Sequence, residues 1–157
     1  MIRNVWAVLC GTAIENSKTK NLSLIEAFGG LRIVVPSSTP DIFHIQTDHT
    51  LGTLWLNTDT ENIVAFTVKL SLILPSGKEI EQAKMEKEVE AGAFWKWVVH
   101  IQTLTIAGPG LYRLVLRVKK KGAERWKRGA ITPFKIEYDT QEDAVFLELP
   151  PRQDGSE

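Results

Sequence analysis

The sequence predicts an all-β protein, a Greek-key sandwich of two sheets with about eight strands. Apolar residues recur at every second position in several segments, and turns rich in glycine and proline separate these segments. Tyr112 follows the turn Gly108-Pro109-Gly110 and begins a further row of alternating aliphatic residues. A tyrosine at such a corner buries its ring and bonds its hydroxyl to upstream backbone, which makes the predicted sandwich immunoglobulin-like.

The N-terminal third supplies the first strands. Residues 2–10 place an early arginine and an apolar run before Cys10, as a bacterial lipoprotein signal does. The charged lead-in is short, however, and bulky Leu9 stands where a signal needs a small residue, so a strand buried on both faces is favoured. Residues 21–30 predict a strand that runs into a single helical turn ended by Gly29-Gly30. Two more strands are predicted over residues 31–35 and 49–57.

The middle of the chain has the clearest alternation. Apolar side chains occupy every even position of residues 64–74, and Pro75-Ser76-Gly77 then reverses the chain. Residues 78–90 leave two alternatives open. Their helix formers and mixed charges suit a helix. Their apolar residues form no broad stripe, so a charged edge strand with irregular pairing is favoured.

The last strands follow the same period. The apolar residues of 94–106 change face, which a bulge near Gln102-Thr103 would reconcile. Residues 112–118 and 134–138 alternate again, and Pro133 suits a strand start or an edge strand. We therefore expect one sandwich domain over residues 1–139, followed by a partly disordered acidic tail over residues 140–157.

The order of these features resembles a family of small bacterial and phage-associated immunoglobulin-like β-sandwich proteins of unknown function. The resemblance rests on a glycine-rich segment before the second strand, a Pro-x-Gly hairpin, a Gly-x-Tyr corner and a Pro-Phe-x-Ile final strand. It covers about residues 20–138. It implies a sandwich and supplies no catalytic residue.

Composition narrows the function classes. The chain has 157 residues, one cysteine and no formal net charge. A single cysteine excludes an intrachain disulfide and fits a reducing, cytoplasmic compartment, and no apolar run approaches the roughly 18 residues of a membrane helix. Neither a GxSxG elbow nor a glycine-rich phosphate motif is present. The sequence predicts a non-enzymatic protein without a cofactor, one that binds a protein partner or a second copy of itself.

A basic hairpin over residues 117–128 is the strongest surface signal. Its lysines and arginines could neutralise phosphates while its tryptophan stacks on a base, which would make it a nucleic-acid site. A solvated hairpin tip is the alternative, and a pI of about 6.8 favours it. The candidate residues are Lys119, Lys120, Lys121, Arg125, Trp126, Lys127 and Arg128.

Two weaker candidates concern sugars and metals. Trp95 and Trp97 share one strand face, which would make a platform for glycan rings if it pointed outward, and core if it pointed inward. Imidazole and carboxylate ligands gather in residues 41–49, but their spacing matches no ligand signature, so a surface loop is favoured and no metal is predicted. The four side chains concerned are Asp41, His44, Asp48 and His49.

The C-terminal tail carries the candidate partner contact. From residue 139 onward there are six acidic residues against one basic residue. A short apolar patch interrupts them, and it could dock on the domain or add a strand to a sheet edge, its own or a neighbour's. The patch consists of Val145, Phe146, Leu147 and Leu149.

Overall fold

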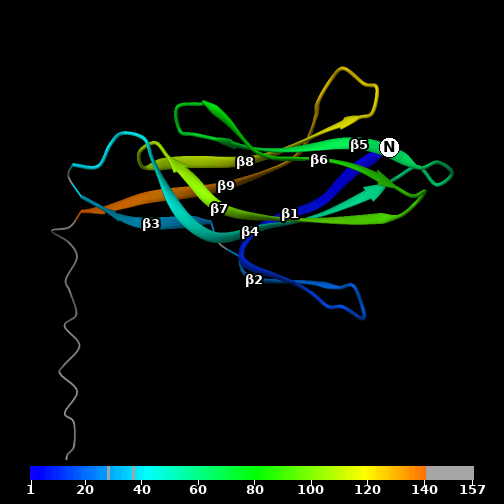
Figure 1. Ribbon diagram of the computed structural model, residues 1–157, viewed down its shortest axis with the longest axis horizontal. Coiled ribbons are helices and arrows are strands. Elements are labelled where there is room, and N and C mark those ends of the chain that lie inside the picture. The colour runs from blue at the N-terminus through cyan, green and yellow to red at the C-terminus, as the bar shows by residue number, and fades with distance from the viewer. Residues whose placement is uncertain (28, 37, 141–157) are drawn as a thin grey trace, which may run out of the picture.

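The protein is built from two packed β-sheets, as Figure 1 shows. The structure is a computed structural model that describes residues 1–27, 29–36 and 38–140. Sheet order is β2-β1-β4-β7 in the four-stranded sheet and β3-β9-β8-β5-β6 in the five-stranded sheet. The predicted all-β sandwich is confirmed, with nine strands among the described residues where about eight were expected. The strands are β1 (Ile2–Glu15), β2 (Leu22–Ala27), β3 (Gly30–Val35), β4 (Phe43–Asn57), β5 (Val64–Ile73), β6 (Glu79–Val89), β7 (Phe94–Ile106), β8 (Gly110–Lys120) and β9 (Lys127–Thr140).

Alternation creates the core between the sheets. The even residues of 64–74 are all at most 3% exposed, and they face the equally buried Leu114 and Leu116 of β8 across the ladder. One row of side chains per strand therefore fills the interior, as a period of two requires. In the part of the chain that the structure describes, no helix is long and apolar enough to cross a membrane.

Tyr112 closes the corner between β7 and β8. Its ring is fully buried and stacks on Phe134, with ring centroids 5.5 Å apart. Its hydroxyl accepts a hydrogen bond from the backbone N–H of Ala107 at 2.8 Å and donates one to the carbonyl of Gly108 at 2.7 Å. The predicted bonds to upstream backbone are therefore present, and burial raises the pKa of the phenol.

The two open questions about strands are resolved by β6 and β7. Residues 79–89 form a strand at the edge of the five-stranded sheet, and Gln82 is the extra residue where the register against β5 shifts. In β7, Ile101 and Leu104 are both buried, because the ladder is irregular there. The irregularity lies where the bulge was predicted, but the extra residue belongs to β4, between Gln46 and His49.

The first 35 residues depart from the prediction. The helical turn expected within residues 21–30 is wrong for the residues that the structure describes there, because β2 extends to Ala27 and β3 begins at Gly30. Burial of β1 on both faces holds for Leu9 and Cys10, whereas Val5 is 49% exposed. Val5 is the extra residue where the register of β1 against β4 shifts, between Asn4 and Trp6. Beyond Cys10, β1 leaves β4 and forms a hairpin with β2, which projects from the body in Figure 1.

This β1–β2 hairpin crosses the outer face of the four-stranded sheet. A Cβ on Gly52 of β4 would lie 2.7 Å from a methyl group of Leu24, so the hairpin needs glycine beneath it. Further along, Glu15 reaches Lys96 of β7 at 4.0 Å. The departure of β1 leaves the first half of β4 with no described strand on that side.

Candidate functional site

The predicted basic hairpin is present, and its tryptophan contacts two lysines. The ring of Trp126 is partly buried, and the ammonium groups of Lys69 and Lys119 lie 5.4 and 5.2 Å from the ring centroid. Cation–π contacts of this kind tie the ring to a lysine of β5 and a lysine of β8. Lys120, Lys121, Arg125, Lys127 and Arg128 are exposed around the turn between β8 and β9.

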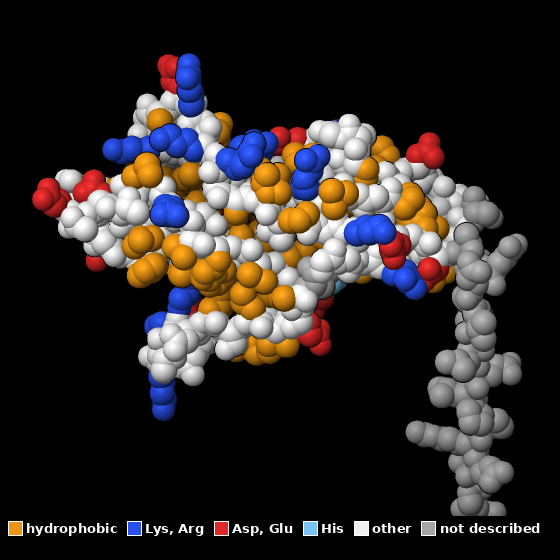
Figure 2. All heavy atoms as spheres, turned by 180° about the vertical axis from the view of Figure 1, so that it is seen from behind, with side chains coloured by type: hydrophobic (Ala, Val, Ile, Leu, Met, Phe, Trp, Pro, Cys, Tyr) orange, Lys and Arg blue, Asp and Glu red, His pale blue; other side chains and the backbone are white. Residues whose placement is uncertain are grey.

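Acidic side chains of β6 reduce the positive charge of this surface. Oε1 of Glu79 lies 2.5 Å from Nη1 of Arg117 and 3.3 Å from Nζ of Lys69. Lys121 lines a hollow of about 260 Å³ together with Glu86 and Glu88. On the face shown in Figure 2, Lys and Arg side chains are likewise interspersed with hydrophobic and acidic ones. The structure therefore brings the predicted lysines and arginines together without a continuous basic field.

Glu79 makes stability depend on pH. The hydroxyl of Ser71, then Lys69 and Arg117, hold the pKa of Glu79 below its usual value of 4.5. A carboxyl group whose pKa is lower in the folded than in the unfolded state stabilises the fold at pH values above its unfolded-state pKa. This stabilisation is lost as the pH falls through the folded-state pKa. Wild type is therefore expected to lose more free energy of unfolding than Glu79→Gln as the pH falls below the usual value of 4.5. Urea denaturation at each pH measures this, and equal pH slopes for the two chains would contradict it.

Trp97 belongs to the core, and Trp95 is partly buried and packs against it. The two indoles stack with centroids 6.1 Å apart, Trp97 is 6% exposed, and Trp95 packs edge-on against Phe66 of the opposite sheet at 5.5 Å. The strand face that they share therefore points toward the opposite sheet, which is the core orientation of the two alternatives.

The histidines and aspartates of residues 41–49 are not gathered into a site. Nδ1 of His44 lies 3.1 Å from the hydroxyl of Thr105, and His49 is in contact with the hydroxyl of Thr47. Burial lowers the pKa of His49, and the charge of Asp48 opposes this effect. Among residues 1–27, 29–36 and 38–140, no three His, Cys, Asp or Glu side chains come close enough to hold a metal ion. The predicted partner contact, Val145, Phe146, Leu147 and Leu149, lies outside the described residues.

A groove between β3 and β4 is the feature that sequence reasoning missed. β3 pairs in parallel with β9 on one side and forms the edge of its sheet on the other. The first half of β4 pairs with β7 alone, since β1 has left by Thr50. Two strand edges without a described neighbour thus border the same space. We call this space the β3–β4 groove.

The β3–β4 groove has a volume of about 550 Å³ and an apolar floor. Leu31, Ile33, Phe43 and Ile45 lie in it half-buried, packed against the core. Its polar end is formed by Thr47, Asp48 and His49. A groove with apolar pockets at alternate positions and free backbone groups along its rim suits an extended peptide.

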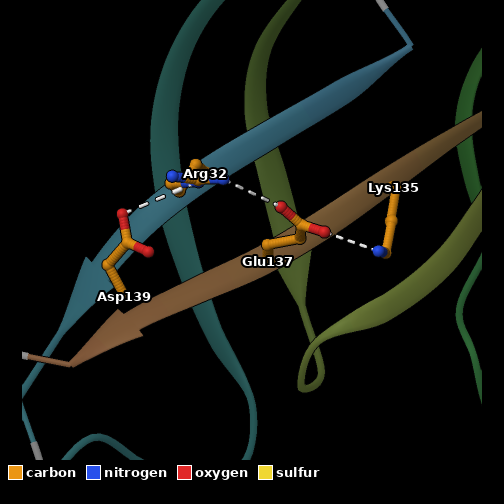
Figure 3. A network of polar contacts seen from close by, with 4 residues as sticks. All are labelled: Arg32, Lys135, Glu137 and Asp139. Carbon is orange, nitrogen blue, oxygen red and sulfur yellow. Dashed lines mark hydrogen bonds and ion pairs between the residues drawn. The ribbon is translucent and has the colours of Figure 1, made fainter.

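The rim of the groove carries a charged network on its outer face, drawn in Figure 3. Nη2 of Arg32 lies 3.4 Å from Glu137, Nε of Arg32 lies 3.7 Å from Asp139, and Glu137 also pairs with Lys135. Lys135, followed by Arg32, lowers the pKa of Glu137. The Arg32 side chain remains 67% exposed, so the network stabilises the fold little and can accept a further partner.

Comparisons with known proteins extend the description of the fold only. No family model matches the chain, and no curated protein matches it. Among solved structures, the chain is similar to part of a β-D-glucoside glucohydrolase from Trichoderma reesei, with 11% identity and a TM-score of 0.51 over 87% of this chain and 19% of that one. It is also similar to part of a Pseudomonas fluorescens alkylpurine DNA glycosylase, AlkC, with 17% identity and a TM-score of 0.39 over 66% of this chain and 27% of the other. A family 123 glycoside hydrolase from Clostridium perfringens shares 13% identity at a TM-score of 0.38, over 90% and 28% of the two chains. The chain spans less than a third of each of these proteins, and the likeness to the glucohydrolase concerns the β-fold.

Proposed function

We propose that the protein is a non-enzymatic binding module that takes an extended, apolar segment of another protein chain into the β3–β4 groove. The observation that carries the proposal is the coincidence of a strand edge that has no neighbour among the described strands with a half-buried apolar floor. In strand addition, backbone hydrogen bonds to the strand edge give affinity, and the apolar floor selects among side chains.

Among the residues that the structure describes, the backbone groups of β3 without a strand partner lie at alternate residues. The N–H of Lys135 donates to the carbonyl of Gly29 at 2.8 Å, which fixes the phase of the parallel ladder. The odd residues of β3 therefore bond to β9, and the N–H of Val34 points to the free edge. The Val34 side chain is 56% exposed, so the core does not depend on it.

Val34→Pro tests the proposal, because proline removes the N–H that points to the free edge and leaves the hydrogen bonds to β9 in place. The probe is a fluorescein-labelled nonapeptide with valine at alternate positions and threonine or glutamate between them. We expect Val34→Pro to weaken its binding about tenfold or more, measured by fluorescence anisotropy. Val34→Thr, which keeps the N–H, is the matched control and should bind as wild type does.

A second peptide of the same composition, with its valines contiguous, controls for non-specific adsorption. Equal affinity for the two peptides, or equal affinity of Val34→Pro and Val34→Thr, would overturn strand addition at β3. Circular dichroism and thermal denaturation of both variants establish that each is folded before binding is compared.

A further inference from the structure

We infer that the chain's own segment Val145–Leu149 docks in the β3–β4 groove as an antiparallel strand beside β3, opposite Val35–Leu31. The inference rests on the proposed function in that it concerns the same groove, and it names an occupant. The five-stranded sheet would thereby gain a sixth strand, in the order tail-β3-β9. A partner segment then has to displace the tail.

The position of the end of β9 makes this docking reachable. β3 and β9 run parallel, and Val35 pairs with Thr140, so the tail begins at the end of the groove where β3 finishes. To reach the free edge of β3, residues 141–144 have to cross two strand spacings, about 10 Å. Four extended residues span at most about 13–14 Å, so the connection closes without moving β9.

Antiparallel pairing from that point gives a match of side-chain type at each position. In this register the β3 residues that line the groove and are half-buried, Val35, Ile33 and Leu31, have apolar tail residues opposite them. These tail residues are Val145, Leu147 and Leu149, in the same order. Phe146 falls opposite Val34, an apolar side chain that is 56% exposed. The sequence alternation of the tail and the two faces of β3 thus coincide in one register, and a shift by one residue would place Glu148 on the apolar floor.

Charge favours the same register. In it, Glu148 falls opposite Arg32 on the outer face of the sheet. Arg32 uses Nη2 and Nε toward β9, and a guanidinium has five N–H donors, so it has donors for a third carboxylate. Opposite charges facing each other across an antiparallel pair are favourable.

A disulfide between Val34→Cys and Phe146→Cys tests the docking without any partner. Directly opposed residues of an antiparallel pair that exchange both hydrogen bonds have Cα atoms about 5.5 Å apart, which a disulfide spans. The matched control is Val34→Cys with Glu148→Cys, a pair two residues out of register. Both variants carry Cys10→Ser, because Cys10 is the one native thiol and is buried. The effective concentration of each thiol pair is measured in glutathione redox buffers.

We expect an intramolecular disulfide whose effective concentration is about tenfold or more above that of the control. Equal values for the two pairs would overturn the docking, and so would a disulfide that forms only between molecules. Binding of the fluorescein-labelled nonapeptide distinguishes a failure of the tail docking from a failure of the proposed function. Leu147→Asp should tighten peptide binding if the tail competes for the groove. A selective disulfide with no peptide binding in any variant would refute the proposed function and leave the docked tail intact.

Discussion

Replacing Gly129 with alanine is expected to lower the free energy of unfolding by about 2–3 kcal/mol, because the new methyl group overpacks the core. A Cβ at this position of β9 would lie 2.8 Å from Cη2 of Trp55 and 3.3 Å from Cζ3. Trp55 is fully buried, and its indole N–H donates to the hydroxyl of Thr53 at 2.9 Å. The ring therefore has no room to retreat, and the backbone of β9 has to shift instead.

Urea denaturation followed by near-ultraviolet circular dichroism measures the effect of Gly129→Ala. Gly29→Ala is the matched control, since a Cβ there meets no atom within 4 Å, and its stability should stay within about 0.5 kcal/mol of wild type. The double variant Gly129→Ala with Trp55→Phe should be less destabilised than the sum of the single changes, because the smaller ring relieves the clash. Additive losses would contradict a direct clash with Trp55.

Replacing Asn57 with alanine is expected to cost about 2–4 kcal/mol, because several buried backbone groups lose their partner at once. The fully buried side chain ends β4, and its Nδ2 donates to the carbonyls of Asn62, Val89 and Glu90 at 2.9–3.1 Å. Its Oδ1 accepts the N–H of Asp59 at 3.0 Å. One amide thus joins the β4–β5 loop to the end of β6.

Asn57→Asp separates hydrogen bonding from packing, since it keeps the shape of the side chain. A carboxylate facing those three carbonyls should destabilise at least as much as alanine does. Asn62→Ala is the control from the same loop, because this residue is exposed and should shift stability by at most about 0.5 kcal/mol. Thermal denaturation of the three variants provides the comparison, and a loss for Asn57→Ala no larger than that for Asn62→Ala would refute the argument.

The local pattern of apolar and polar residues was sufficient to predict most strands, but not which strands pair with one another. The rows of β5 and β8 and the buried hydroxyl of Tyr112 depend on residues within a few positions of one another. The pairing of Gly30 with Lys135 does not, and neither does the crossing of the β1–β2 hairpin over Gly52. Such contacts are decided by the packing of the whole domain, which no period in the sequence records.

The candidate sites illustrate the same limit. The basic residues of 117–128 are conspicuous because they are consecutive, whereas Glu79, which neutralises part of their surface, comes from a distant strand. The β3–β4 groove exists because β4 continues past the point where β1 stops pairing at Cys10. Only the apolar residues of 31–35 and the alternation of Phe43 and Ile45 with polar residues could have hinted at it.

The parallel pairing of β3 with β9 also limits the order in which the strands can fold during synthesis. Contacts such as that between Arg32 and Glu137 join residues 105 positions apart. At a translation rate of about 5–20 residues per second, β3 waits roughly 5–20 s after leaving the ribosome before its only described strand partner is synthesised. Throughout that interval neither edge of β3 is paired with β9, so the five-stranded sheet cannot be completed until β9 has emerged.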